Sequence, residues 1–305
     1  MIKQKKVIKN RVVTFTTKKA GEKARGKKKL TSFRTLVLTR HPSHSPLRVK
    51  LPLLPFRSVL RLGSTTPVHD GRVELNSVQG VKNSSNKLLM KQCFKQANIK
   101  TANWGKASDV DVINDGGIQF STDINGCQGL EFPIVAKSHY GSRGEGNTLI
   151  RTKEAFNNWK STRILTNYIL EKFLPFKYEY RFHTNKNGVF YVCRKALMEE
   201  TPKEKRWMMN SQTCVWYLEN NEKFYKPSSF ETIKQECVKA LYSLGLDFCA
   251  FDIRVQSETD SKGNIRNLQD FFIIEGNSAP SLQQHGLEHY LVQIPLILKE
   301  KHANL

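Results

Sequence analysis

The sequence predicts a mixed α+β protein whose sheets are largely antiparallel. Apolar runs rich in β-branched and aromatic residues alternate along the chain with longer amphipathic stretches of helical period. Residues 179–183 and 188–195 form the clearest hairpin pattern, because Asn185-Lys-Asn-Gly188 between them has turn chemistry. Residues 248–255 and 271–277 are two further strand-like runs, joined by a polar stretch that contains glycine. A second antiparallel pair is therefore expected near the C-terminus.

The remaining elements follow in chain order from the same patterns. Residues 34–39 and 58–62 predict short buried strands on either side of a proline-rich connection, and residues 73–76 predict a third. Residues 98–129 are rich in Asp, Gly and Asn, which predicts loops and one short strand. Further strands are expected at 132–137 and 168–174, and helices at 84–97, 152–160, 228–244 and 287–300.

Positive charge is concentrated at the N-terminus of this 305-residue chain. The formal net charge is +22 and the pI is near 9.8. Residues 1–34 hold thirteen Lys and Arg against one acidic residue, Glu22. The segment 1–30 has little to bury, which predicts a solvated basic arm. The functional alternative is contact of this arm with the phosphate backbone of a nucleic acid, although no aromatic ladder interleaves with its basic residues.

Cysteine usage and hydropathy indicate the compartment. The six cysteines show no CxxC pair and no regular spacing, which favours buried free thiols in a reducing environment over a zinc site. No apolar run approaches the length that crosses a bilayer, and no signal-peptide pattern follows the basic start. These features predict a cytoplasmic protein without a membrane partner.

Changes in composition predict three parts. Residues 1–30 are the basic arm, residues 31–82 are a small α/β region, and residues 83–305 form the main domain. Within the main domain, two subdomains are expected at about 83–170 and 171–305.

Pairs of polar residues end two of the expected strands. Glu275 and Asn277 follow an apolar run and are two residues apart, so their side chains are expected on the same face. Asp252 and Arg254 have the same spacing on the preceding strand. Carboxylate and amide oxygens suit a hard cation such as Mg²⁺. The alternative is a set of ordinary polar residues at the ends of a sheet.

A glycine-rich segment follows the strand that ends in Lys137. Residues 139–147 contain Gly141, Gly144 and Gly146, which would let backbone N–H groups approach phosphate oxygens. The segment lacks the GK[ST] of a P-loop and the glycine order of the Rossmann fingerprint. The lysine just before it favours phosphate binding over the alternative, a flexible hairpin tip.

Taken in order, these features resemble the ATP-grasp superfamily of carboxylate–amine ligases. The resemblance covers about residues 84–300, and its most specific part is Ile273-Ile-Glu-Gly-Asn-Ser-Ala-Pro-Ser-Leu282. This stretch is similar to the Leu-Glu-x-Asn-x-x-Pro-Gly segment of the dipeptide ligases, with Ser281 in place of the final glycine. The resemblance implies an ATP-grasp fold, in which two α/β subdomains grip ATP, preceded here by a short N-terminal α/β region.

The resemblance also implies a nucleotide-binding set. Two lysines would bind the ATP phosphates, a glycine loop would close over them, one glutamate with the backbone after it would hold adenine, and a second glutamate would meet the ribose. In that order, these residues are Lys87 and Lys137; Gly141, Ser142, Gly144 and Gly146; Glu171 with Lys172 and Phe173; and Glu179.

The metal and catalytic residues are implied in the same way. Asp252, Glu275 and Asn277 match the ligands of Mg²⁺, with Mn²⁺ as the alternative ion. Three basic residues would steady the transferred phosphate or the substrate carboxylate, namely Arg181, Lys195 and Arg254. His285 lies just past the metal strand and would face the substrate, with a surface histidine as the simpler interpretation.

The implied reaction joins a carboxylate to an amine at the expense of ATP. The carboxylate attacks the γ-phosphorus to form an acyl phosphate, and the amine then displaces phosphate; the acceptor is a small molecule, a peptide or a protein. One alternative is a phosphotransferase on the same scaffold. Another, from a different class, is a basic nucleic-acid-binding or virion-associated protein with a vestigial ATP site.

Two departures from the superfamily pattern bear on the substrate. The region 31–82 is shorter than the usual N-terminal domain, and Ala250 stands where dipeptide ligases commonly have arginine, which disfavours a D-alanine-type substrate. The compact N-terminal region and Arg61-Leu-Gly-Ser64 are similar to uncharacterised ATP-grasp proteins of tailed bacteriophages. This weaker resemblance implies action in the cytoplasm of a bacterial host.

Overall fold

The computed structural model describes residues 31–39, 42–69, 71–124, 126–141, 144–176, 178–210, 213–259, 265–282 and 284–305. The arm 1–30 and Ser142 lie outside this description. By its contacts the chain divides into a smaller unit, residues 1–78 with 281–305, and a larger unit, residues 79–280. The sequence-based division assigned 281–305 to the larger part, whereas the contacts group these residues with the N-terminal ones.

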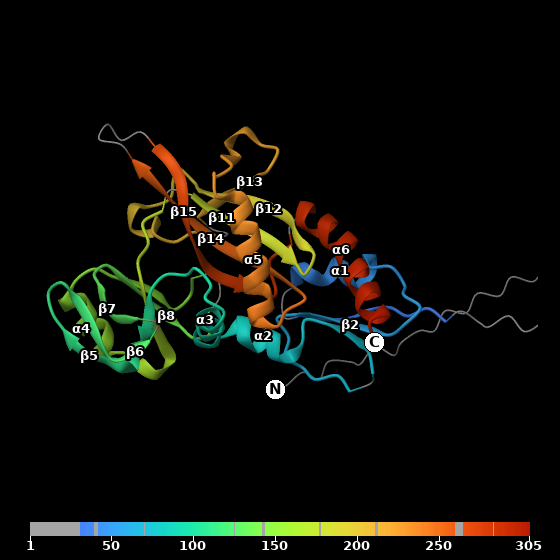
Figure 1. Cartoon of the computed structure of the whole chain (residues 1–305), viewed down its shortest axis with the longest axis horizontal. Helices are drawn as coiled ribbons and strands as arrows, with labels where there is room; N and C mark the ends of the chain where they lie inside the picture. Colours follow the sequence, from blue (N-terminus) through green and yellow to red (C-terminus); the bar gives the residue numbers. More distant parts are fainter. Residues whose placement is uncertain are drawn as a thin grey trace, which may run out of the picture. The chain divides into compact units, whose positions relative to one another are not determined.

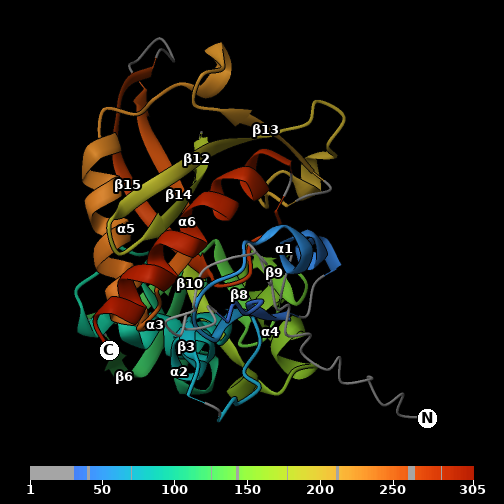
Figure 2. The same cartoon turned by 90° about the vertical axis from the view of Figure 1, so that its right-hand side faces the viewer.

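The smaller unit contains a parallel three-stranded sheet in the order β1-β2-β3. Its central strand is buried along its whole length. The C-terminal helix packs against β3 and α1 (Figure 2) and buries Tyr290, Ile294 and Leu298. The elements are β1 (Leu36–Thr39), α1 (Ser45–Lys50), β2 (Ser58–Leu62), β3 (Val73–Leu75) and α6 (Gln284–Ala303), with a short 3-10 turn η1 (Pro42–His44).

The first part of the larger unit holds two antiparallel sheets, in the orders β4-β10-β8-β9 and β5-β6-β7. Helix α4 contributes Phe156 and Trp159 to the apolar cluster beside these sheets. The elements are β4 (Trp104–Lys106), β5 (Val110–Ile113), β6 (Gly117–Ile124), β7 (Cys127–Glu131), β8 (Ile134–Ser138), β9 (Asn147–Ile150), α4 (Lys153–Ser161) and β10 (Tyr168–Lys172), with η2 (Ala107–Asp109) and η3 (Leu165–Asn167).

The expectation of loops and one short strand at 98–129 is wrong, because this segment contributes four strands, β4 to β7. Ile118 and Leu130 are buried between polar neighbours, so the apolar face of these strands is narrow and the polar composition hides it. Gly117 and Gly129 are needed for the pairing itself: a Cβ on either would collide with a backbone carbonyl oxygen of the opposite strand.

The second part of the larger unit is a five-stranded antiparallel sheet in the order β13-β12-β11-β14-β15, crossed on one face by α5 (Figure 1). Tyr180, Phe182, Phe251 and Ile273 pack with the helix in the largest apolar cluster. Both antiparallel pairs expected from the sequence are present. The elements are β11 (Tyr178–Asn185), β12 (Gly188–Leu197), β13 (Cys214–Leu218), α5 (Phe230–Leu244), β14 (Phe248–Thr259) and β15 (Ile265–Asn277), with η4 (Lys203–Lys205) and η5 (Glu222–Phe224).

The helix expected at 84–97 is α3 (Lys87–Gln96), and a break of one residue separates it from a preceding helix that was not expected, α2 (Val78–Ser85). The break falls at Asn86, whose side chain accepts a hydrogen bond from Leu89 N (3.1 Å) and so caps α3. The buried face of α3 consists of Met90 and Phe94 together with two lysines, Lys87 and Lys91. The helix therefore directs lysine side chains inward rather than to solvent.

No helix in the described part of the chain combines the length and the apolar character needed to span a membrane.

Candidate functional site

Three lysines gather around one buried carboxylate in the first part of the larger unit. Glu171 lies on β10. Its Oε1 is 2.7 Å from Nζ of Lys137 on the neighbouring strand β8, and its Oε2 is 2.7 Å from Nζ of Lys91 on α3. Lys91 also donates to the hydroxyl of Thr101. Lys87, one helical turn before Lys91, is buried on the same face of α3. We refer to Lys87, Lys91, Lys137 and Glu171 as the lysine group.

Burial and charge act against each other in the lysine group. Burial by itself raises the pKa of Glu171, but Lys137 and Lys91 outweigh it and lower that pKa to about 2. Burial lowers the pKa of Lys91, against the attraction of Glu171. The pKa of Lys87 is also lowered by burial, opposed by Glu275, with a smaller lowering from Lys137. Even with Glu275 counted, which acts on both Lys87 and Lys91, the three lysines outnumber the carboxylates, so this group favours a negatively charged ligand.

The glycine-rich segment is tied to the start of α3. Lys87 N donates to His139 O (2.9 Å) and Lys87 Nζ donates to Gly141 O (2.8 Å). Gly144 and Gly146 have positive φ values of 81° and 74°, which side chains other than glycine rarely adopt. A Cβ on Gly144 would also collide with the sulfur of Met208, so the segment lies directly against the β12–β13 connection.

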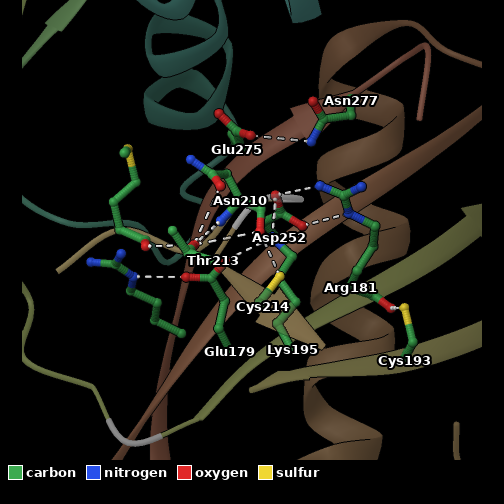
Figure 3. A network of polar contacts seen from close by, with 12 residues as sticks. Glu179, Arg181, Cys193, Lys195, Asn210, Thr213, Cys214, Asp252, Glu275 and Asn277 are labelled. Atoms are coloured by element: carbon green, nitrogen blue, oxygen red, sulfur yellow. Dashed lines mark hydrogen bonds and ion pairs between the residues drawn. The ribbon is translucent and has the colours of Figure 1, made fainter. Parts of the chain in front are cut away.

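A ladder of alternating charges spans three adjacent strands of the five-stranded sheet, β12, β11 and β14, and four of its residues, Glu179, Arg181, Lys195 and Asp252, are labelled in Figure 3. The strand register sets Glu179 on β11 opposite Lys195 on β12 and Arg254 on β14, and sets Arg181 opposite Asp252. Glu179 Oε1 lies 2.7 Å from Lys195 Nζ, and its Oε2 lies 3.1 Å from Arg254 Nε. Asp252 accepts Arg181 Nε (2.7 Å) and Nη2 (2.8 Å), and its Oδ2 lies 2.9 Å from Lys195 Nζ. These five residues are referred to below as the charged ladder.

Every titratable shift in the charged ladder favours the ionised form. Burial raises the pKa of Asp252, but Arg181 and Lys195 hold that pKa well below its usual range. Burial lowers the pKa of Lys195, but Asp252 and Glu179 raise it above its usual value. Asp252 likewise raises the pKa of Arg181 against burial. With three basic and two acidic residues, the ladder has a surplus of one positive charge.

The proposed metal ligands lie on adjacent strands. Asp252 on β14 is directly opposite Glu275 on β15, and Asn277 Nδ2 donates to Glu275 Oε1 (3.3 Å; Figure 3). An ionised carboxylate has about four acceptor positions, and the bonds from Arg181 and Lys195 use three of those of Asp252. One acceptor position of Asp252 thus stays available to a metal ion, together with side-chain oxygens of Glu275 and Asn277.

Asp252, Glu275 and Asn277 suit Mg²⁺, because this ion prefers oxygen ligands. It commonly takes one or two carboxylates from the protein and completes its coordination shell with phosphate and water. Within the described residues, no three His, Cys, Asp or Glu side chains converge into a metal-binding group. A cation here would consequently depend on oxygens that a phosphate ligand brings.

Eight of the residues expected from the sequence fall into these two groups. Glu275, opposite Asp252 of the ladder, also acts on the pKa of Lys87 in the lysine group. The backbone expected to hold adenine is different. Lys172 N donates to Asn103 O (2.9 Å) and Phe173 N donates to Pro133 O (3.2 Å), so neither N–H group is available to a base in this structure. Adenine binding by this backbone therefore stays a prediction. The expected contact of His285 with the substrate stays a prediction as well, because the side chain of His285 lies outside the described residues.

Two residues of the site were missed from the sequence. Lys91 follows Lys87 by one helical turn, and this spacing is the signal that could have revealed it. Trp216 on β13 lies opposite Lys195. Its position depends on the strand register, which the sequence does not show.

Comparison with known proteins identifies the fold. No family model and no curated protein matches this chain. Among solved structures, D-alanine–D-alanine ligase from Bacillus anthracis complexed with ATP is 12% identical, with 81% of each chain covered and a TM-score of 0.51. The same enzyme from Coxiella burnetii is 11% identical, with 81% of this chain and 69% of that chain covered (TM-score 0.50). N5-carboxyaminoimidazole synthetase from Staphylococcus aureus complexed with ADP is 15% identical, with 77% and 56% covered (TM-score 0.51).

The chain therefore has an ATP-grasp fold, which confirms the fold predicted from the sequence. At these levels of identity the likeness concerns the fold alone, and the activity must be argued from the residues of this chain.

Proposed function

We propose that this protein is an ATP- and Mg²⁺-dependent ligase that joins a carboxylate to an amine through an acyl phosphate. The charged ladder carries the proposal: the buried Lys195 and the part-buried Arg181 and Arg254 lie beside Asp252 and the Glu275–Asn277 pair, with surplus positive charge. Transfer of a phosphoryl group concentrates negative charge on a few oxygens, and catalysis of this step depends on fixed cations directed at them.

The position of each residue sets its proposed role in phosphate binding, phosphoryl transfer or the exclusion of water. Lys87 and Lys137 bind phosphate oxygens, because the lysine group is short of negative charge. Arg181, Lys195 and Arg254 steady the transferring phosphoryl group and the substrate carboxylate. The segment 141–146 closes over them and excludes water from the acyl phosphate.

Metal binding falls to Asp252, Glu275 and Asn277. Bound Mg²⁺, or Mn²⁺ in its place, would neutralise phosphate charge at this end of the site. Glu171 and Glu179 are assigned to adenine and ribose, so each would exchange a lysine or arginine contact for one with the nucleotide.

The amine and the carboxylate belong to small molecules or to a peptide or protein. Ala250, opposite Asn277, is small and apolar, which argues against a D-alanine-type acceptor. We expect the protein to act in the cytoplasm, and in that of a bacterial host if it is encoded by a phage. The arm 1–30 is expected to be a solvated basic segment, with contact to nucleic acid as the functional alternative.

The proposal is tested by trapping the acyl phosphate. The whole chain is incubated with ATP, Mg²⁺, a panel of carboxylates and hydroxylamine, and hydroxamate is measured. Lys137→Ala and Glu275→Gln should abolish it. The matched controls Lys95→Ala and Glu231→Gln change exposed residues of α3 and α5 and should retain it.

The other outcomes decide between the alternatives. Phosphorylated product without hydroxamate would favour the phosphotransferase. Lack of ATP binding in calorimetry would rule out both enzymes. Salt-sensitive DNA or RNA binding that disappears on deletion of residues 1–30 would then support the nucleic-acid-binding alternative.

A further inference from the structure

Trp216 covers two cations of the charged ladder. It lies on β13, the edge strand, directly opposite Lys195 on β12. The centroid of its ring is 5.5 Å from Lys195 Nζ and 5.2 Å from Arg181 Cζ. Both distances are within the range of a cation–π interaction.

Side chains along β13 alternate between the two faces of the sheet, so only one of the two neighbouring aromatic residues faces the charged ladder. Tyr217, the next residue, points to the opposite face of the sheet, where it pairs with Arg194 and lies 5.6 Å from its Cζ. Trp216 and Tyr217 are both half-buried aromatic rings over basic residues of β12. Only Trp216 is on the face that carries Asp252, Arg181 and Lys195.

An aromatic ring holds a cation differently from a carboxylate. Asp252 and Glu179 fix Lys195 but cancel its charge, whereas a π face attracts the ammonium group and leaves its net charge intact. The ring also covers one side of the ladder, which keeps water from weakening the field of the two cations. Lys195 can then shift from its carboxylates toward a phosphate while one of its contacts stays in place.

We propose that Trp216 is a positioning residue that holds Arg181 and Lys195 for the transferred phosphoryl group. This inference rests on the proposed function, since it assigns the two cations to the transfer step. Its effect should fall on the transfer rate rather than on nucleotide binding, because the phosphate-binding lysines Lys87 and Lys137 belong to the lysine group.

The test compares Trp216→Leu, Trp216→Phe and Tyr217→Leu in the whole chain, using hydroxamate formation with the best carboxylate of the panel. Trp216→Leu should lower kcat about tenfold, the order expected for losing contacts to two partly desolvated cations, with the KM for ATP within about twofold of the wild type. Trp216→Phe keeps a π face and should recover most of the rate. Tyr217→Leu is the matched control and should leave the rate unchanged.

A spectroscopic measurement gives an independent readout. Phosphate oxygens that attract Arg181 and Lys195 should change the surroundings of the indole. ATP with Mg²⁺ should therefore alter the tryptophan emission of the wild type and of Tyr217→Leu, and this change should be smaller in Trp216→Phe, in which Trp104, opposite Glu171, and Trp207, beside Arg254, still contribute.

Several results would overturn the inference. An unchanged kcat in Trp216→Leu would do so, as would equal losses in Trp216→Leu and Tyr217→Leu or a failure of phenylalanine to restore the rate. An emission change as large in Trp216→Phe as in the wild type would also count against it. If the wild type binds ATP but forms no hydroxamate, the proposed function fails instead, and the inference about Trp216 falls with it.

Discussion

Glu171→Gln removes the carboxylate that Lys91 and Lys137 share, and its cost can be worked out from the structure. The pKa of Glu171 falls from its ordinary value of 4.5 to about 2 in the folded protein, and the side chain is almost fully buried. Each tenfold change in proton affinity corresponds to 1.36 kcal/mol, so this carboxylate contributes about 3 kcal/mol to the free energy of unfolding at pH 7. Loss of one partner of a buried ion pair has a similar cost, about 3–5 kcal/mol.

The pH dependence of this cost has a defined sign. The pKa of Glu171 is lower in the folded state than in the unfolded state, so its stabilisation is complete above about pH 5. Stability is lost as the pH falls from the unfolded value of 4.5 through about 2, below which the carboxyl group is protonated in both states. The wild type and Glu171→Gln should therefore differ most at neutral pH and converge in acid.

Denaturant unfolding between pH 3 and pH 8 measures this difference. Glu131→Gln is the matched control, because Glu131 is an exposed glutamate on β7 of the same part of the larger unit. The reasoning is refuted if Glu171→Gln is no less stable than Glu131→Gln at pH 7, or if its deficit does not shrink on acidification.

Three further predictions concern the site and the arm. Lys91→Met leaves one oxygen of Glu171 without its lysine and should weaken ATP binding about tenfold in calorimetry, whereas the exposed Lys95→Met should not; equal affinities would contradict the role of Lys91. Arg181→Lys loses the two-pronged contact with Asp252 and should lower the rate of hydroxamate formation about tenfold or more, and an unchanged rate would remove Arg181 from the site. Deleting residues 1–30 should abolish salt-dependent binding to DNA or RNA in a filter assay, and retained binding would place that activity elsewhere in the chain.

The sequence predicted those site residues whose chemistry depends on local spacing. Asp252 and Arg254, like Glu275 and Asn277, are two residues apart on a strand, and two-residue spacing places side chains on the same face wherever the strand lies in the sheet. Lys137 was identifiable because it precedes the glycine-rich segment. Strand pairing then sets Asp252 opposite Glu275, as an antiparallel pair requires.

The missed features depend on partners that are distant along the chain. In the sequence, Trp216 is one of several aromatic residues between 199 and 227, and only the pairing of β13 with β12 sets it beside Lys195. Lys91 was missed because an amphipathic helix pattern predicts that lysines face solvent. Its charge is instead buried and balanced by Glu171, which lies on the distant strand β10. Helix α2 was missed as well, because its buried residues, Gly80, Val81 and Ser84, include only one large apolar side chain.

The polar segment 98–129 shows how composition alone misleads. Its strands bury few apolar side chains and rely on glycines for close backbone approach, so turn-forming residues dominate the pattern.

The central claim is that the charged ladder and the Glu275–Asn277 pair form a site for ATP with a divalent cation. Calorimetric titration of ATP into the whole chain, with and without Mg²⁺, tests it most directly when the wild type is compared with Glu275→Gln. The wild type should bind ATP, and Mg²⁺ should strengthen that binding; Glu275→Gln should keep the metal-free binding and lose the gain from Mg²⁺. Absence of ATP binding in the wild type, or an equal gain from Mg²⁺ in both proteins, would contradict the account.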